Sequence, residues 1–459
     1  MRTWLGILVL TACGQAAEEV PDSSPPVQGR PDAGPPLVED AAPPPPVASP
    51  ARYPTAGLRS PLTPSVAARM REIAARNAGR DPRVFMKVGA SGTVSPRLLY
   101  CFGGGYRVDL DGRDALQPTI DWFRAGDAAG TSPFSRVTLA AEVGKTAAWA
   151  IAGDPSPLEQ EIAAVNPRFA LVNYGTNDMG AGPSYGVGLV AFHENLSKLL
   201  DQLEAEGIVP LVSGLNPRAD TATAEQWVPI FDAVTRAMAE ERQLPYLSMY
   251  AASSALPDLG LISDGIHGNV YFELGDAQPC VFDAAGLQFN YNVRNLESLR
   301  LFDDARRAVI GGENGAAGDM PAIAGEGTHE RPYLIDRLPF IHAGDSRAGE
   351  RRFHSYPACD QGQDESGPEI VYQLALEHAT PLRIAVLDRT EVDVDAHFLL
   401  GDAAEDCQIR HDRVISTLAP GGEARIVVDS FVTGDQELAG RYLLVVLPCE
   451  VGDPQCIAP

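Results

Sequence analysis

Apolar positions recur with two different periods in two parts of the chain. Between residues 63 and 310, short apolar runs typical of buried strands alternate with segments whose apolar residues fall at helical spacing. The expected strands are residues 84–88, 169–174, 209–213 and 244–249, and the expected helices are 64–77, 189–206, 225–242 and 293–309. Because strands that alternate with helices pair in parallel, this part is predicted to be an α/β domain with helices on both faces of its sheet.

The helical period disappears in the last part of the chain, residues 329–459. Short β-type runs at 370–376, 382–386, 396–400, 424–428 and 442–447 are separated by turn residues, which predicts a small antiparallel β-sandwich. The Gly- and Ala-rich residues 311–328 are expected to link the two domains. The alternating Val and Asp residues near the end of 388–395 are more typical of an edge strand with its polar face in water than of a calcium site.

The N-terminus reads as a targeting segment. Residues 1–12 contain Arg2 and a short apolar run, typical of a signal peptide, and they end in a sequence that resembles a bacterial lipobox before Cys13. The resemblance implies cleavage before Cys13, acylation of its thiol and a lipid-anchored protein of the bacterial envelope, at the outer membrane or cell surface. A plain secretory signal is the alternative. Residues 13–62 are rich in Pro and are expected to form an extended tether.

The net charge and the cysteine content indicate which binding partners and which covalent links to expect. The formal net charge of −25 disfavours a nucleic-acid partner. Apart from Cys13, the chain has six cysteines, none in a metal-ligand pattern, so an exported chain is expected to use them in disulfides. We expect Cys101 to pair with Cys280. The four cysteines of the second domain allow three connectivities, which the sequence leaves open.

Reactive residues follow three of the predicted strands. Ser91 follows 84–88, Asn177 and Asp178 follow 169–174, and Asp264 and His267 lie in the loop after the last strand. Ligands of open parallel sheets bind beyond the carboxyl ends of the strands, so these side chains are expected to converge.

These segments resemble the blocks of the SGNH (GDSL-like) hydrolase family. Gly89-Ala90-Ser91 is similar to the nucleophile block, Gly175-Thr176-Asn177-Asp178 to the GxND block and Asp264-Gly265-Ile266-His267 to the DxxH block. The resemblance covers about residues 84–309 and implies a three-layer, flavodoxin-like fold without metal or cofactor. It further implies oxyanion donors at Ser91, Gly144 and Asn177, where Gly144 is our choice for the glycine block. The aspartate that usually precedes the serine is replaced by Ala90. The second domain loosely resembles the bacterial pre-peptidase C-terminal type.

The chemistry of the set is that of acyl transfer. A serine hydroxyl needs a base, and a neutral imidazole held in one tautomer by a carboxylate provides it. His267 and His193 are the two histidines of the first domain, and His193 lies in an amphipathic helix, where a solvent-facing or capping role is expected. Ser91, Asn177 and Asp264 could each be ordinary turn residues.

The sequence thus predicts a serine esterase with an acyl-serine intermediate. Its substrate would be an acylated carbohydrate, for example an O-acetyl ester, or a short-chain or lipid ester. Two alternatives stay open: an acyltransferase that uses the same site, and a non-catalytic surface lipoprotein on a degenerate hydrolase scaffold.

Overall fold

The computed structural model describes residues 52–53, 57–319, 322–360, 362–434 and 436–449. The expected signal peptide, Cys13 and nearly all of the expected tether lie outside the described residues, as does Cys456. None of the helices in the described ranges has the length and apolar character needed to cross a membrane.

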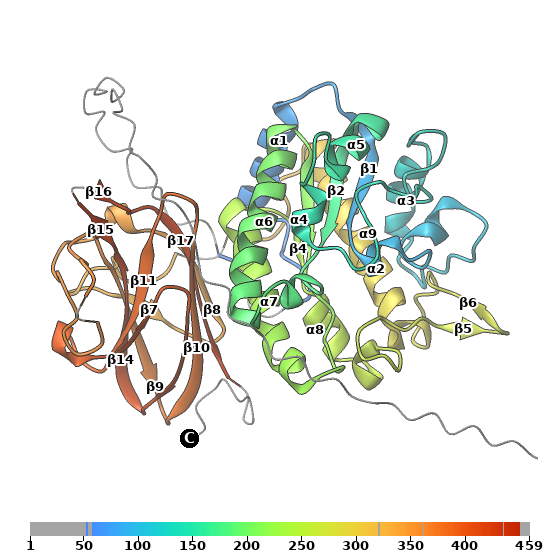
Figure 1. Cartoon of the computed structure of the whole chain (residues 1–459). Helices are drawn as coiled ribbons and strands as arrows, with labels where there is room; N and C mark the ends of the chain where they lie inside the picture. The colour runs from blue at the N-terminus through green and yellow to red at the C-terminus, as the bar shows by residue number, and fades with distance from the viewer. Residues whose placement is uncertain (1–51, 54–56, 320–321, 361, 435, 450–459) are drawn as a thin grey trace, which may run out of the picture. The chain divides into compact units, whose positions relative to one another are not determined.

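The α/β domain is built on a parallel sheet whose strand order follows the chain (Figure 1). Its strands are β1 (Asp81–Gly89), β2 (Pro167–Asn173), β3 (Val209–Ser213) and β4 (Tyr246–Leu247). The prediction of a strand over 244–249 is too long. Ser248 instead caps the short helix α8 (Met249–Ser254), since its Oγ accepts a hydrogen bond from the N–H of Ala251 at 3.0 Å.

Two groups of helices cover this sheet. Helices α1 (Pro64–Ala75), α3 (Gln117–Arg124) and α9 (Asn290–Val309) pack together, while α4 (Ala147–Ala150), α5 (Pro157–Val165), α6 (Tyr185–Ala205) and α7 (Ala222–Arg242) form the other group. The caps explain several starts: Thr63, Ser184 and Thr221 each accept a backbone hydrogen bond at the start of α1, α6 and α7. The sequence analysis missed α3 and α5.

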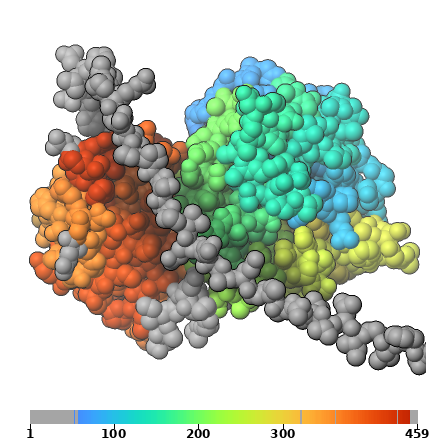
Figure 2. All heavy atoms as spheres, viewed as in Figure 1, coloured from blue at the N-terminus to red at the C-terminus, as the bar shows by residue number. Residues whose placement is uncertain are grey.

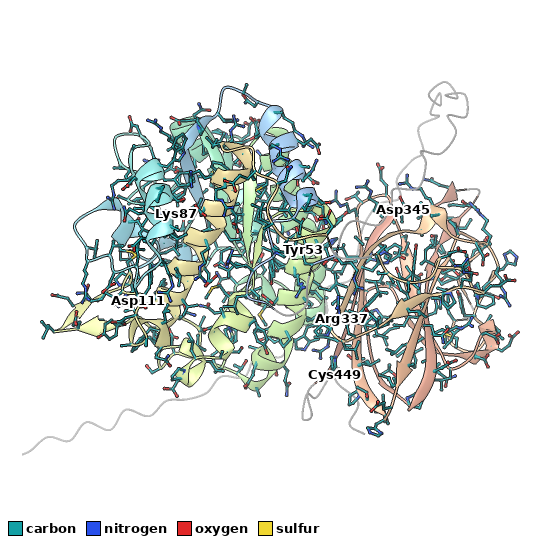
Figure 3. The ribbon with its side chains drawn as sticks, turned by 180° about the vertical axis from the view of Figure 1, so that it is seen from behind. Tyr53, Lys87, Asp111, Arg337, Asp345 and Cys449 are labelled. Carbon is teal, nitrogen blue, oxygen red and sulfur yellow. A yellow bond between two sulfur atoms is a disulfide. The ribbon has the colours of Figure 1, made fainter. Side chains whose placement is uncertain are left out.

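The core between these layers is dense and largely aromatic around β1. Phe85 contacts the rings of Phe123, Phe134 and Phe302 at centroid distances of 5.4, 5.2 and 4.3 Å. Lys87, labelled in Figure 3, lies within this domain with 1% of its surface exposed. Its Nζ donates to the carbonyl oxygen of Phe134 at 3.0 Å, and burial lowers its pKa to about 7.

The C-terminal part contains two large β-sheets and a two-stranded sheet of β15 (Val432–Thr433) and β16 (Gln436–Glu437). One large sheet has the order β13-β10-β17-β8 and the other β12-β11-β14-β9-β7. All neighbours pair antiparallel except β7 with β9. The strands are β7 (Tyr333–Ile335), β8 (Phe340–Asp345), β9 (Ile370–Leu376), β10 (Thr380–Asp388), β11 (Val394–Leu399), β12 (Cys407–His411), β13 (Val414–Ala419), β14 (Gly422–Ser430) and β17 (Arg441–Pro448), of which β7, β8, β12 and β13 were not predicted.

Two expectations about polar residues are wrong. β11 lies between β12 and β14, so it is not an edge strand. Asp395 is buried rather than exposed to water, and Arg410 of β12 compensates its charge by donating to its Oδ2 at 2.6 Å. His193 does not face solvent: α6 buries it to 3% exposure, and that burial lowers its pKa to about 3. The expected Cys101–Cys280 disulfide is present, together with a Cys359–Cys407 disulfide.

Candidate active site

The carboxyl ends of β1 and β2 approach each other closely where the site begins. β1 ends at Gly89, and Ser91 is the first residue of the one-turn helix α2 (Ser91–Val94). A Cβ at position 89 would lie 2.6 Å from the carbonyl oxygen of Asn173 and 2.2 Å from Oγ1 of Thr93. Glycine is therefore required here so that the backbone can turn sharply into α2 beside the neighbouring strand.

Ser91, His267 and Asp264 form a continuous chain of hydrogen bonds. Oγ of Ser91 lies 2.9 Å from Nε2 of His267, and Nδ1 of His267 lies 2.7 Å from Oδ2 of Asp264. The side chains of His267 and Asp264 are 41% and 42% exposed, so the imidazole is accessible to a substrate. The three predicted residues are thus brought together within proton-transfer distance.

The carboxylate of Asp264 also holds the loop that carries His267. Oδ1 of Asp264 accepts hydrogen bonds from the backbone N–H groups of Ile266 and His267, both at 2.9 Å. Although desolvation opposes it, hydrogen bonding from His267 and Ile266 keeps the pKa of Asp264 below its usual value. Gly265 has φ +70°, and a Cβ there would lie 2.7 Å from the backbone of Ala219, so a side chain would displace this loop.

Asn177 and Asp178 organise the opposite side of the site. Nδ2 of Asn177 donates to the carbonyl oxygen of Lys145 at 2.8 Å, which fixes the amide and leaves its second N–H for another acceptor. The two oxygens of Asp178 accept hydrogen bonds from the backbone N–H groups of Gly175 (3.0 Å) and Ala147 (2.9 Å). Burial raises the pKa of Asp178 to about 6. Asp178 therefore ties the Asn177 loop to the start of α4.

Gly144 lies close to the site without lining it. It occupies an exposed turn before α4 with φ +78°, and its neighbour Lys145 lines the cavity beside Asn177. The turn is therefore where the sequence analysis expected it, and the role of the Gly144 N–H as an oxyanion donor remains a prediction.

The cavity around Ser91 and His267 is small, about 30 Å³. The sequence analysis did not find five of the side chains that line it: Asn173, Tyr174, Asn216, Tyr291 and Arg294. The sequence held one indication of a buried polar face here: polar residues at 290, 294 and 298 recur at helical spacing, just before and within the expected last helix. These three are buried, at 0%, 2% and 1% exposure. A larger cavity of about 520 Å³ borders Arg59, Glu297 and Arg300 and contains none of the predicted site residues.

A hairpin follows the loop that carries His267. β5 (Phe272–Glu273) and β6 (Asp276–Ala277) project from the α/β domain, in yellow in Figure 2. Leu274 at its tip is fully exposed and Phe272 is 53% exposed.

Comparison with known proteins agrees with this arrangement. Residues 126–271 match the sequence model of the GDSL-like lipase/acylhydrolase family. No curated protein matches the chain.

Similar solved structures are distant in sequence. A GDSL-like lipase from Bacteroides thetaiotaomicron is 14% identical, covers 52% of this chain and 99% of its own, and has a TM-score of 0.31. A two-domain esterase active on acetylated mannans is 15% identical over 83% of this chain and 95% of its own, with a TM-score of 0.29. The pre-peptidase C-terminal domain of a collagenase from Bacillus anthracis is 13% identical over 24% of this chain and 89% of its own, with a TM-score of 0.16.

The family match spans the Asn177 block, the Asp264–His267 block and the turn at Gly144. The α/β domain of this chain therefore contains a region, residues 126–271, that matches the GDSL-like lipase/acylhydrolase family.

Proposed function

We propose that this protein hydrolyses carboxylic esters through an acyl-enzyme formed on Ser91. The observation that carries the proposal is the hydrogen-bonded chain from Ser91 through His267 to Asp264, with an imidazole that a substrate can reach. A buried serine–histidine pair could not meet an ester, and an exposed serine without a base would stay protonated.

The proposed reaction has two halves. Nε2 of His267 takes the hydroxyl proton while Oγ of Ser91 attacks the ester carbonyl carbon, and the proton then passes to the departing alcohol as the C–O bond breaks. Water attacks the resulting acyl-serine in the same way, which releases the carboxylic acid and returns the proton to Ser91. Asp264 keeps the proton of the neutral imidazole on Nδ1 throughout, so that Nε2 remains the base.

The tetrahedral intermediates carry negative charge on the former carbonyl oxygen. The proposed donors are the amide of Asn177 and the backbone N–H groups of Ser91 and Gly144. Ser91 is the first residue of α2, where an N–H has no acceptor within the helix. Each donor of this kind is worth about 3–4 kcal/mol of activation free energy.

The size of the cavity supports a small acyl group. A space of about 30 Å³ holds roughly one water-sized group, so it suits the methyl of an acetyl ester better than a long chain. The lining is mostly polar, with amide and hydroxyl side chains from Asn173, Thr176 and Asn216. We therefore propose O-acetylated carbohydrate as the substrate class.

A chain-length series tests both parts of this proposal. We expect hydrolysis of p-nitrophenyl acetate to exceed that of the octanoate by at least about tenfold in kcat/KM, and acetate to be released from acetylated oligosaccharides. Ser91→Ala should abolish both activities, whereas Ser95→Ala, four residues away, should retain them. Acetyl transfer to a sugar added as acceptor, at the expense of acetate release, would assign the acyltransferase alternative. The absence of any turnover by the wild-type protein would refute esterase function.

We also propose that the protein is held in the bacterial envelope by an acylated Cys13. Its support is the lipobox-like sequence before Cys13 and the Pro-rich stretch after it. Metabolic labelling with a fatty acid should mark the full chain, and Cys13→Ser should lose the label and release the protein. Retention of the label in Cys13→Ser would refute the anchor.

A further inference from the structure

A buried cation lies against the backbone of the nucleophile turn. Arg294 of α9 is 2% exposed and lines the same cavity as Ser91 and His267. Its Nη2 donates to Oδ1 of Asn173 at 2.8 Å, and its Nη1 donates to the carbonyl oxygen of Gly92 at 3.4 Å. Both acceptors are neutral, and no carboxylate among the described residues comes within salt-bridge distance of this guanidinium.

The other charged groups around the site have partners of opposite charge or hydrogen-bond donors. Lys145 pairs with Glu142 at 3.2 Å and Arg218 with Asp220 at 2.6 Å, while Oδ2 of Asp264 lies 2.7 Å from Nδ1 of His267. Asp178 faces two backbone N–H groups. The hydroxyl of Tyr291 lies 3.5 Å from the same Gly92 carbonyl that Arg294 contacts. Within the part of the chain that the structure describes, Arg294 therefore brings to the cavity a positive charge that has hydrogen-bond acceptors but no carboxylate partner, and burying such a charge is costly.

The contacts of Arg294 also join the ends of three strands. Nδ2 of Asn173 donates to the carbonyl oxygens of Ser213 (3.1 Å) and Gly214 (2.8 Å), so its Oδ1 is directed at Arg294. Asn173 ends β2, Ser213 ends β3, and Gly92 follows β1. A Cβ at Gly92 would lie 2.8 Å from Nη1 of Arg294, so even alanine there would push the guanidinium away.

We propose that Arg294 is a positioning residue that fixes the nucleophile turn to the sheet and places a positive charge beside the reacting groups. The inference rests on the proposed function. During attack, negative charge develops on the ester oxygen and positive charge on the imidazole. A nearby cation stabilises the negative charge on the ester oxygen.

The test compares two variants that separate charge from shape. Arg294→Lys keeps the charge but loses the forked contact, whereas Arg294→Met keeps similar length and loses the charge. Arg300→Met, on the same helix and outside the catalytic cavity, is the matched control. The measurement is the rate at which a fluorophosphonate labels Ser91 at pH 7, per folded protein, with melting temperatures recorded in parallel.

We expect Arg294→Met to label about 10–100-fold more slowly at pH 7. Arg294→Lys keeps the charge, so it should recover most of that loss and label about threefold to tenfold more slowly than the wild type, and Arg300→Met should match the wild type. A normal rate in folded Arg294→Met would overturn the proposal. So would an unchanged rate in Arg294→Lys, which decides the matter if Arg294→Met does not fold.

The outcomes also separate the two proposals. A wild-type protein that labels at Ser91 but turns over no ester would refute the proposed function, and the labelling rates of the variants would still test Arg294. Normal ester turnover with identical labelling rates for all variants would refute the role of Arg294 alone.

Discussion

His267 of the α/β domain and three buried histidines of the sandwich lie in opposite environments. His267 of the α/β domain is 41% exposed, and each ring nitrogen has a side-chain partner. The sandwich histidines His329, His342 and His397 are at most 4% exposed, and burial lowers the pKa of the last two to about 3. A base must exchange its proton with both substrate and serine, which only the first environment allows. Surroundings, rather than residue type, thus separate the base from the structural histidines.

Buried carboxylates show the same contrast. In the α/β domain, both carboxylate oxygens of Asp178 accept hydrogen bonds from backbone N–H groups at the site. In the sandwich, Tyr356 donates to Asp429 at 2.7 Å and Glu369 lies 2.6 Å from Nε2 of His329. The first bond ties Tyr356 to β14 and the second ties Glu369 to His329, so the polar groups there stabilise structure. The comparison predicts that substitutions in the first set change rate and those in the second change stability.

The largest expected effect is the loss of turnover in Ser91→Ala and His267→Ala. Each should reduce kcat by about 10⁴-fold or more, because neither the nucleophile nor its base has a substitute at the site. His342→Gln is the counterpart in the sandwich: it should leave kcat per folded molecule unchanged and lower the melting temperature, since it disturbs the 2.7 Å contact with the Tyr372 hydroxyl. A loss of kcat in folded His342→Gln would contradict the comparison.

The next largest effect is expected at Asn177. Asn177→Ala should reduce kcat by about 10²–10³-fold with little change in KM, because an oxyanion donor acts mainly in the transition state. Asn195→Ala removes an amide that bonds only to the carbonyl oxygen of Ala191 within α6, and should keep full activity. Equal activity of Asn177→Ala and wild type would remove Asn177 from the oxyanion hole.

Much of the α/β domain followed from local pattern, and the exceptions have physical causes. Long helices such as α6 and α7 were found because their apolar period is sustained over several turns. α5 is only nine residues long, and its strongest signal was the Ser156–Glu159 capping box rather than an apolar period. In the sandwich, every residue of β12 beyond Cys407 is exposed or half-buried, so this strand lacks the apolar run of a core strand.

The residues of the candidate site that lie in short sequence blocks could be predicted. Those that only tertiary packing brings to the site could not. Ser91, Asn177, Asp264 and His267 each follow a strand, so order along the chain pointed to them. Arg294 comes from the last helix, and its position beside Gly92 depends on how α9 packs across the strand ends. The polar spacing at 290, 294 and 298 could indicate a buried polar face of this helix, but not its contact with Gly92.

A smaller effect is expected for Asp264→Asn. The carboxylate orients His267, but 42% of its side chain is exposed, so water can partly replace it. We expect kcat to fall by about 10–100-fold, because an asparagine amide that donates to Nδ1 of His267 leaves the imidazole proton on Nε2, where it blocks proton transfer from Ser91. Asp283→Asn, on the loop before α9, is a suitable control, since its Oδ1 contacts only local N–H groups. A fall as large as in Ser91→Ala would mean that Asp264 does more than orient the base.

The smallest effect tests stability in the sandwich. Glu365 is fully buried, and burial together with the charge of Asp395 raises its pKa to about 9. A carboxyl whose pKa is higher in the folded state contributes most at low pH, and that contribution is lost as pH rises from about 4.5 through 9. Glu365→Gln should therefore be more stable than wild type by roughly 1–2 kcal/mol at pH 8, with the difference gone near pH 4.

Urea unfolding at pH 4, 6 and 8 measures this, with Glu377→Gln as the control because Glu377 is exposed on the same domain. The control should follow the wild-type curve, and ester turnover per folded molecule should be equal in all three proteins. If Glu365→Gln were instead less stable at pH 8, the ionised carboxylate would be stabilising. The sandwich would then use buried charge as Arg294 is proposed to do beside Ser91, and the contrast between the two domains would fail at that point.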